Sequence, residues 1–263
     1  MAETYTYESY KELMDNLLKE GKTSGEDQSE FMVSLTKLNR QRIKRLDNTL
    51  ELTAEQTAFF ANLTGEQSWV VISECWCADA AQILPVIAKV AEANPHIHLS
   101  IVLRDENPEL MNQYLTNGGK AIPILIISDK ATGKVLHVWG PRPKTATAMV
   151  EAYKKEHGKL SPEFKEDLQK WYNQDKGQSI IQDLITLFPN EDSTIPCQTN
   201  GCLFRLLPHG RRSHTSAFPE GDSAGSGTPK SPIATRAGSP DGHFPSYSRA
   251  ELAIPPRDRP APE

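Results

Sequence analysis

Short apolar runs alternate with helical spacing between about residues 68 and 157, and this alternation is the strongest constraint on the fold. The run at 68–73 is nearly all apolar and rich in β-branched residues, which is typical of a strand buried on both faces. Strands are expected at 68–73, 96–103, 122–127 and 135–139. Helices are expected at 78–93, 108–115 and 144–157. The last two strands are separated by a short Gly-containing turn, which predicts a hairpin. The order predicts an α/β fold, a mixed sheet flanked by helices.

Further helices are expected on both sides of this core. The N-terminal ones lie at about 7–20, 28–47 and 53–63, the third beginning with the capping-box pattern of Thr53 and Gln56. The C-terminal ones lie at 161–175 and 178–188. The second helix carries a basic run, which favours a solvated face near a helix C-terminus; the run comprises Arg40, Arg42, Lys44 and Arg45.

The composition changes near Pro189. Before residue 190 the chain has 16 Lys and 5 Arg, and from 190 onward it has 1 Lys and 7 Arg. The remainder is rich in Pro, Ser and Gly without period, so it cannot bury enough apolar surface to offset ordering. We therefore predict four regions: a helical extension at 1–63, a core at 64–157, C-terminal helices at 158–190 and a disordered tail at 191–263. The tail is either an ordinary linker-like segment or the product of a frameshift.

Charge and cysteine content narrow the function classes. The net charge is −5, which disfavours a nucleic-acid or anionic-membrane surface. Neither a membrane-spanning stretch nor the pattern of a secretory signal is present at the sequence level, so a cytoplasmic, reducing location is expected. The seven histidines show no metal-ligand spacing, and no Gly-rich phosphate loop is found. We predict neither a metal nor a cofactor.

A cysteine lies where the first core strand meets its helix, in the segment 76–80 with the sequence Trp-Cys-Ala-Asp-Ala. Ile122 and Pro123 open a later strand before the hairpin, and Gly140 ends the last strand. In this order the features resemble the thioredoxin superfamily, and most closely bacterial thioredoxin family proteins with a Trp-Cys-x-x-Ala site. The resemblance covers about 68–155. It implies a thioredoxin-like fold and a cis-proline at Pro123 that faces the cysteine.

Cys77 is the candidate catalytic residue. A thiol in the first turn of a helix lies near unpaired N–H groups and the positive end of the helix dipole, which stabilise a thiolate. We expect a lowered pKa; the alternative is an inert, packed thiol. The resemblance implies that Trp76 frames the sulfur and that Ile122 and Pro123 hold the backbone of a substrate.

Two departures from the family pattern concern the step that releases the substrate from the first cysteine. Ala80 replaces the resolving cysteine, and Val71 replaces a buried acidic residue. Asp79 occupies the position of the family's motif proline. It is either a local acid or base beside the sulfur or, as we favour, a carboxylate stabilised by the helix N-terminus.

The other cysteines are weaker candidates. Cys75 could act as a resolving thiol only through a tight and strained ring with Cys77, and it is more simply a bystander. Cys197 and Cys202 fall in the predicted tail. Arg142 follows the last strand, so it lies either at the rim of the site or on the solvated surface.

Two functions of different classes remain. The favoured one is a monothiol oxidoreductase that acts on protein disulfides or a low-molecular-weight thiol through a mixed disulfide on Cys77. The other is a thioredoxin-fold binding or scaffold module without turnover. A peroxide-reducing thiol enzyme is the least favoured. The oligomeric state is not predictable from the sequence.

Overall fold

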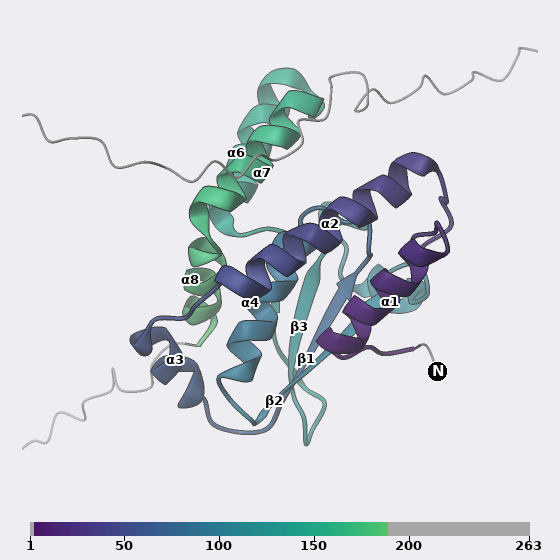
Figure 1. Cartoon of the computed structure of the whole chain (residues 1–263). Coiled ribbons are helices and arrows are strands. Elements are labelled where there is room, and N and C mark those ends of the chain that lie inside the picture. Colours follow the sequence, from purple (N-terminus) through teal and green to yellow (C-terminus); the bar gives the residue numbers. More distant parts are fainter. Residues whose placement is uncertain (1–2, 189–263) are drawn as a thin grey trace, which may run out of the picture. The chain divides into compact units, whose positions relative to one another are not determined.

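The computed structural model describes residues 3–188, which contain a four-stranded sheet and helices before, within and after it (Figure 1). The strands are β1 (Gln67–Ser73), β2 (Ile97–Leu103), β3 (Ile124–Asp129) and β4 (Val135–Trp139). The helices are α1 (Tyr7–Lys19), α2 (Glu30–Thr49), α3 (Ala54–Ala61), α4 (Ala80–Glu92), α5 (Pro108–Gln113), α6 (Lys144–His157), α7 (Pro162–Asp175) and α8 (Gln178–Leu187). The predicted order of elements is confirmed.

The sheet has the strand order β2-β1-β3-β4. The β1 and β2 strands run parallel, with α4 as their crossover, and β3 and β4 form the antiparallel hairpin. The β1 strand pairs on both sides and therefore lies inside the sheet, and its residues Trp69, Val71 and Ile72 are buried. This is the predicted mixed sheet flanked by helices, so the fold class is confirmed.

The N-terminal extension packs onto the core. Thr6 and Ser29 accept hydrogen bonds that cap α1 and α2, and Thr53 and Gln56 form the predicted capping box of α3. In Figure 1, α2 lies along α4, and these two helices make the most extensive helix-helix contact in the described part of the chain. The extension therefore covers the helix that follows Cys77.

The sequence predicted that the basic run on α2 forms a solvated face near the end of the helix. The structure does not show such a face. The helix continues to Thr49, so the run is not in its last turn. Arg40 forms a salt bridge with Asp15, and Arg45 donates to Gln82 on α4 at 3.2 Å. Lys44 is exposed. The prediction was wrong because Arg40 and Arg45 bind side chains of α1 and α4.

The C-terminal helices close the other side of the core. Ser161 caps α7, as expected, and α7 reaches α4 through a hydrogen bond between Gln82 and Gln169 of 3.0 Å. The buried carboxylate of Asp183 on α8 accepts from the indole of Trp139 at 3.2 Å. No helix among residues 3–188 is both long and apolar enough to span a membrane. The predicted tail, with Cys197 and Cys202, lies outside the described residues.

Candidate thiol site at the start of helix α4

Cys77 lies in the turn between β1 and α4 and faces the start of β3. Its Sγ accepts a hydrogen bond from the Ala80 N–H at 3.5 Å and donates to the Ile122 carbonyl at 3.4 Å. The peptide bond between Ile122 and Pro123 is cis. The structure therefore brings together the helix N-terminus, the thiol and the cis-proline segment, as the resemblance implied.

The Cys77 thiol is not activated in the way that the sequence predicted. Burial and the charge of Asp79 raise its pKa to about 12, although the N–H groups of Ala80 and Asp79 and the charge of Arg142 oppose this effect. The side chain is only 7% exposed. The helix terminus does stabilise the thiolate, but desolvation is the larger effect here. The expectation of a lowered pKa was wrong for this state of the protein.

Asp79 is the centre of a polar cluster next to Cys77. It occupies the N-cap position of α4 but makes no capping hydrogen bond with its side chain. Its carboxylate instead forms a salt bridge with Arg142 at 2.6 Å and accepts from the hydroxyl of Tyr172 at 3.0 Å. Arg142 comes from the loop after β4 and Tyr172 from α7. Three distant segments thus meet within two residues of the thiol.

Cys75 has different surroundings. Burial raises the pKa of its thiol to about 11, and hydrogen bonding with the hydroxyls of Ser24 and Tyr10 opposes the rise. Neither hydroxyl belongs to the Cys77 cluster. Both cysteines are free thiols in the structure.

The backbone around Cys75 is tied to the N-terminal extension. Its N–H donates to Ser24 Oγ at 2.9 Å, and its carbonyl accepts from the amide of Asn39 at 3.0 Å. Ser24 also donates to the buried carboxyl of Glu74, which accepts from the Asp105 N–H at 2.9 Å. These bonds fix the segment that leads into Cys77.

Trp76, which lies between Cys75 and Cys77 in the sequence, is half-buried. The guanidinium of Arg104 lies 4.8 Å from the centroid of its ring. On the other flank, the loop at Gly25 comes so close that an added Cβ would lie 3.3 Å from the indole Nε1. The indole is therefore held in place by the N-terminal loop as well as by Arg104.

A family model described as Thioredoxin matches residues 25–154. The chain carries a thioredoxin-like domain. The match begins in the loop at Gly25, ahead of α2, and ends in α6. No curated protein matches the sequence.

Two solved structures are similar to part of this chain. One is a protein of unknown function from Pseudomonas aeruginosa, and the other is an HIV epitope scaffold. Each is 16% identical, has a TM-score of 0.44, and matches 66% of this chain and 95% of its own.

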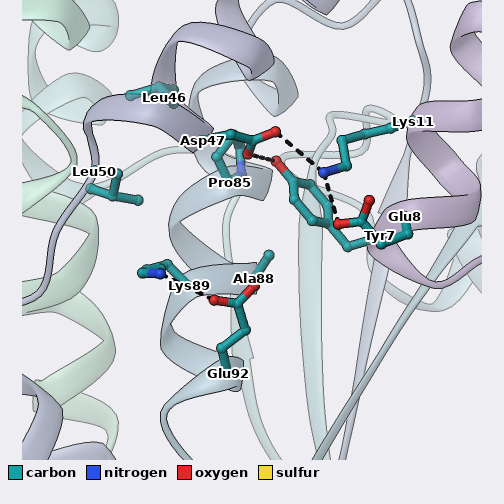
Figure 2. A pocket seen from close by; sticks show the side chains of 10 residues that line it. All are labelled: Tyr7, Glu8, Lys11, Leu46, Asp47, Leu50, Pro85, Ala88, Lys89 and Glu92. Atoms are coloured by element: carbon teal, nitrogen blue, oxygen red, sulfur yellow. Dashed lines mark hydrogen bonds and ion pairs between the residues drawn. The ribbon is translucent and has the colours of Figure 1, made fainter.

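A separate pocket of the thioredoxin-like domain lies away from the thiol, between α1, α2 and α4 (Figure 2). It has a volume of about 190 Å³. Its polar side chains bind one another: Tyr7 donates to Asp47 at 2.6 Å, and Lys11 bridges Glu8 and Asp47. Cys77 does not line it. Because these groups are already paired, we assign no ligand to this pocket.

Sequence reasoning missed several residues around the thiol. Arg142 was placed at the rim as one of two alternatives, and its salt bridge with Asp79 decides for the rim. Ser24, Asn39 and Tyr172 gave no signal because each is an ordinary polar residue in its own segment. Within the described part of the chain, no group of three His, Cys, Asp or Glu residues is arranged to hold a metal ion.

Proposed function

We propose that the thioredoxin-like domain is a monothiol thiol-disulfide oxidoreductase with Cys77 as its nucleophile. The observation that carries this proposal is the position of the sulfur. It accepts the Ala80 N–H at the start of α4 and faces the Ile122 carbonyl that precedes the cis-proline Pro123. A thiolate formed there is stabilised by N–H groups and by the helix dipole.

The reaction has two exchange steps. The thiolate of Cys77 attacks one sulfur of a disulfide, the bond between the two substrate sulfurs breaks, and the leaving thiolate takes a proton from water. A second thiol molecule then attacks the mixed disulfide and releases Cys77 as a thiolate. The electrons come from that second thiol, because Ala80 offers no resolving sulfur. Substrate disulfides of proteins or of small thiols both satisfy this scheme.

The raised pKa of Cys77 sets the expected rate. Near neutral pH only a small fraction of the thiol is ionised, so the resting protein should react slowly with general thiol reagents. A thiolate of high pKa is a stronger nucleophile once formed, which offsets part of this loss. Arg142 favours the ionised form. The small thiolate fraction thus limits the rate of this reaction near neutral pH.

We assign Trp76 to one wall of the site and Ile122 with Pro123 to the wall that pairs with the substrate. Cys75 is not required in this scheme. Burial raises the pKa of its thiol to about 11, and its backbone N–H is held by Ser24, so a resolving role would need this buried segment to move. A cytoplasmic location fits the need for a reduced thiol.

A second candidate function is a scaffold or binding module without turnover. The burial of Cys77 and its raised pKa favour it, because a thiol that remains protonated makes no mixed disulfides. In that case the polar cluster at Asp79 would serve only to join α4, α7 and the loop after β4.

Turnover separates the two functions. The full chain would be mixed with a peptide carrying a mixed disulfide and an excess of reduced glutathione, and release of the free peptide thiol would be followed with time. We expect release that depends on Cys77 and survives Cys75→Ser. Mass spectrometry should find the intermediate disulfide on Cys77. Equal release by the wild type and by Cys77→Ser would support the scaffold instead.

A further inference from the structure

Three arginines lie near the short segment that carries the thiol, and two of them bind it directly. Arg142 forms a salt bridge with Asp79 at 2.6 Å. Arg45 donates to Gln82, in the first turn of α4, at 3.2 Å. Arg42 donates at 2.8 Å to the Asn39 side chain, whose amide holds the Cys75 carbonyl. Arg142 and Arg45 thus contact this segment directly, whereas Arg42 is connected to it through Asn39.

This cluster has more positive than negative charge. Asp79 is the carboxylate bound to it, through Arg142. Within residues 3–188, neither Arg42 nor Arg45 forms a salt bridge, although both are partly buried. Burial lowers the pKa of both, and the proximity of Arg45 adds to the effect at Arg42. The charge of Asp79 opposes this effect at Arg42. Placing two partly buried cations next to each other costs free energy, which a bound anion would recover.

Arg142 adds a specific unsatisfied donor. Its Nε is buried and has no hydrogen-bond partner, while its terminal nitrogen binds Asp79. Buried donors are usually paired. A guanidinium can donate through several N–H groups at once, so Arg142 can hold Asp79 and a second acceptor together.

Neighbouring segments cover the thiol. The N-terminal extension lies on one flank, through Ser24 at Cys75 and Gly25 at Trp76. The α7 helix lies on another flank, through Tyr172 at Asp79. Cys77 itself is only 7% exposed. A large protein surface would have to displace these segments to reach the sulfur, whereas a small molecule needs less room.

We infer that the disulfide exchanged at Cys77 belongs to a small molecule that carries carboxylates, held by Arg42, Arg45 and Arg142. This inference rests on the proposed function and adds the substrate class to it. The carboxylates of the substrate would offset the positive charge of the guanidinium groups. The segments that cover Cys77 favour a small substrate.

The test compares small disulfides that differ in charge. Oxidised glutathione is the anionic probe, bis(2-hydroxyethyl) disulfide the neutral one and cystamine the cationic one. The rate of mixed-disulfide formation on Cys77 would be measured for each at low ionic strength by mass spectrometry of the full chain. Since every rate on one variant shares the same thiol, the ratio of anionic to neutral rates removes changes in the reactivity of Cys77 itself.

The variants test whether the charges of Arg42 and Arg45 produce the preference for an anionic disulfide. The double variant Arg42→Gln with Arg45→Gln keeps hydrogen-bonding side chains but removes both charges. Lys44→Gln is the matched control, since Lys44 lies exposed on the same helix between them. We expect the wild type to prefer oxidised glutathione, the double variant to reduce its anionic-to-neutral ratio by about tenfold, and the control to change it little. Added salt should reduce the wild-type ratio.

Two results would overturn the inference in distinguishable ways. If Cys77 reacts with all three probes at similar rates, or if the double variant keeps the wild-type ratio, the substrate class is wrong while the exchange chemistry stands. If Cys77 reacts with none of the probes, the proposed oxidoreductase function fails, and this inference fails with it. A thermal unfolding curve on each variant shows whether it is folded before its rates are compared.

Discussion

The two cysteines are separated by one residue, yet their thiols belong to different regions of the molecule. Cys77 faces the cis-proline segment and the charged cluster of Asp79 and Arg142. Cys75 lies among the hydroxyls of Ser24 and Tyr10, which come from the N-terminal extension. Both are buried, and burial raises the pKa of each.

Burial alone therefore does not distinguish the two thiols. What separates them is the neighbouring groups. Around Cys77 the structure places a helix N–H, a cation and the Ile122 carbonyl next to the cis-proline. Around Cys75 it places hydrogen bonds that connect two parts of the fold. We expect chemical effects from changes in the first region and stability effects from changes in the second.

The largest expected effect is at the sulfur itself. Cys77→Ser should abolish disulfide exchange, because a serine hydroxyl does not form mixed disulfides. Cys75→Ser should retain exchange within a few-fold and lower the melting temperature instead. The measurement is exchange with oxidised glutathione, paired with thermal unfolding of both variants. Loss of exchange in Cys75→Ser, with the fold intact, would mean that Cys75 takes part in the exchange reaction. The distinction between the two thiols would then be wrong.

The next effect is in the region of Cys75. Asn39→Ala removes the donor to the buried Cys75 carbonyl. It should lower the free energy of unfolding by about 1–3 kcal/mol, since a buried carbonyl is left without a partner. Urea unfolding measures this loss. Gln41→Ala, at an exposed position of the same helix, serves as the control and should change stability far less.

A smaller change is expected from Asp79. Its negative charge raises the pKa of Cys77, so Asp79→Asn should lower that pKa and leave Arg142 free to lower it further. The alkylation rate of Cys77 near neutral pH should then rise by about tenfold. A change of about 1.4 kcal/mol in the free energy of ionisation, in favour of the thiolate, makes the thiolate fraction tenfold larger. The rate is read against pH with a neutral reagent. The control Glu92→Gln, at the far end of α4, should leave the rate unchanged. An unchanged rate in Asp79→Asn would show that the charge of Asp79 does not affect the pKa of Cys77.

The smallest effect concerns pH and Glu74. Burial raises the pKa of this carboxyl above its ordinary value of 4.5, although Ser24 and the Asp105 N–H oppose the rise. A raised folded-state pKa means that its contribution to stability is present below about 4.5 and is lost as the pH rises through the folded-state pKa. Glu74→Gln should flatten this part of the stability curve, measured as the urea midpoint against pH. A curve with the wild-type slope would show that Glu74 stays neutral or does not control the slope.

Much of the fold could be predicted because its signals are local. The apolar run at 68–73, the turn before β4 and the capping box at Thr53 each depend on neighbours in the sequence. The position of Cys77 at a strand-to-helix junction is local as well. The basic run on α2 was misassigned for the opposite reason, since only the packing of α2 on α4 determines which arginines become buried.

By itself, the sequence determined the order of strands and helices, the thioredoxin-like core and the position of its principal thiol. Only the tertiary structure decided the state of that thiol. A pKa depends on desolvation and on charges that approach from elsewhere, and Arg142 and Tyr172 come to Asp79 from segments 63 and 93 residues away. The cover provided by Ser24, Asn39 and α7 is equally nonlocal. Periodicity specifies which elements form, whereas the contacts between them fix the chemistry of Cys77.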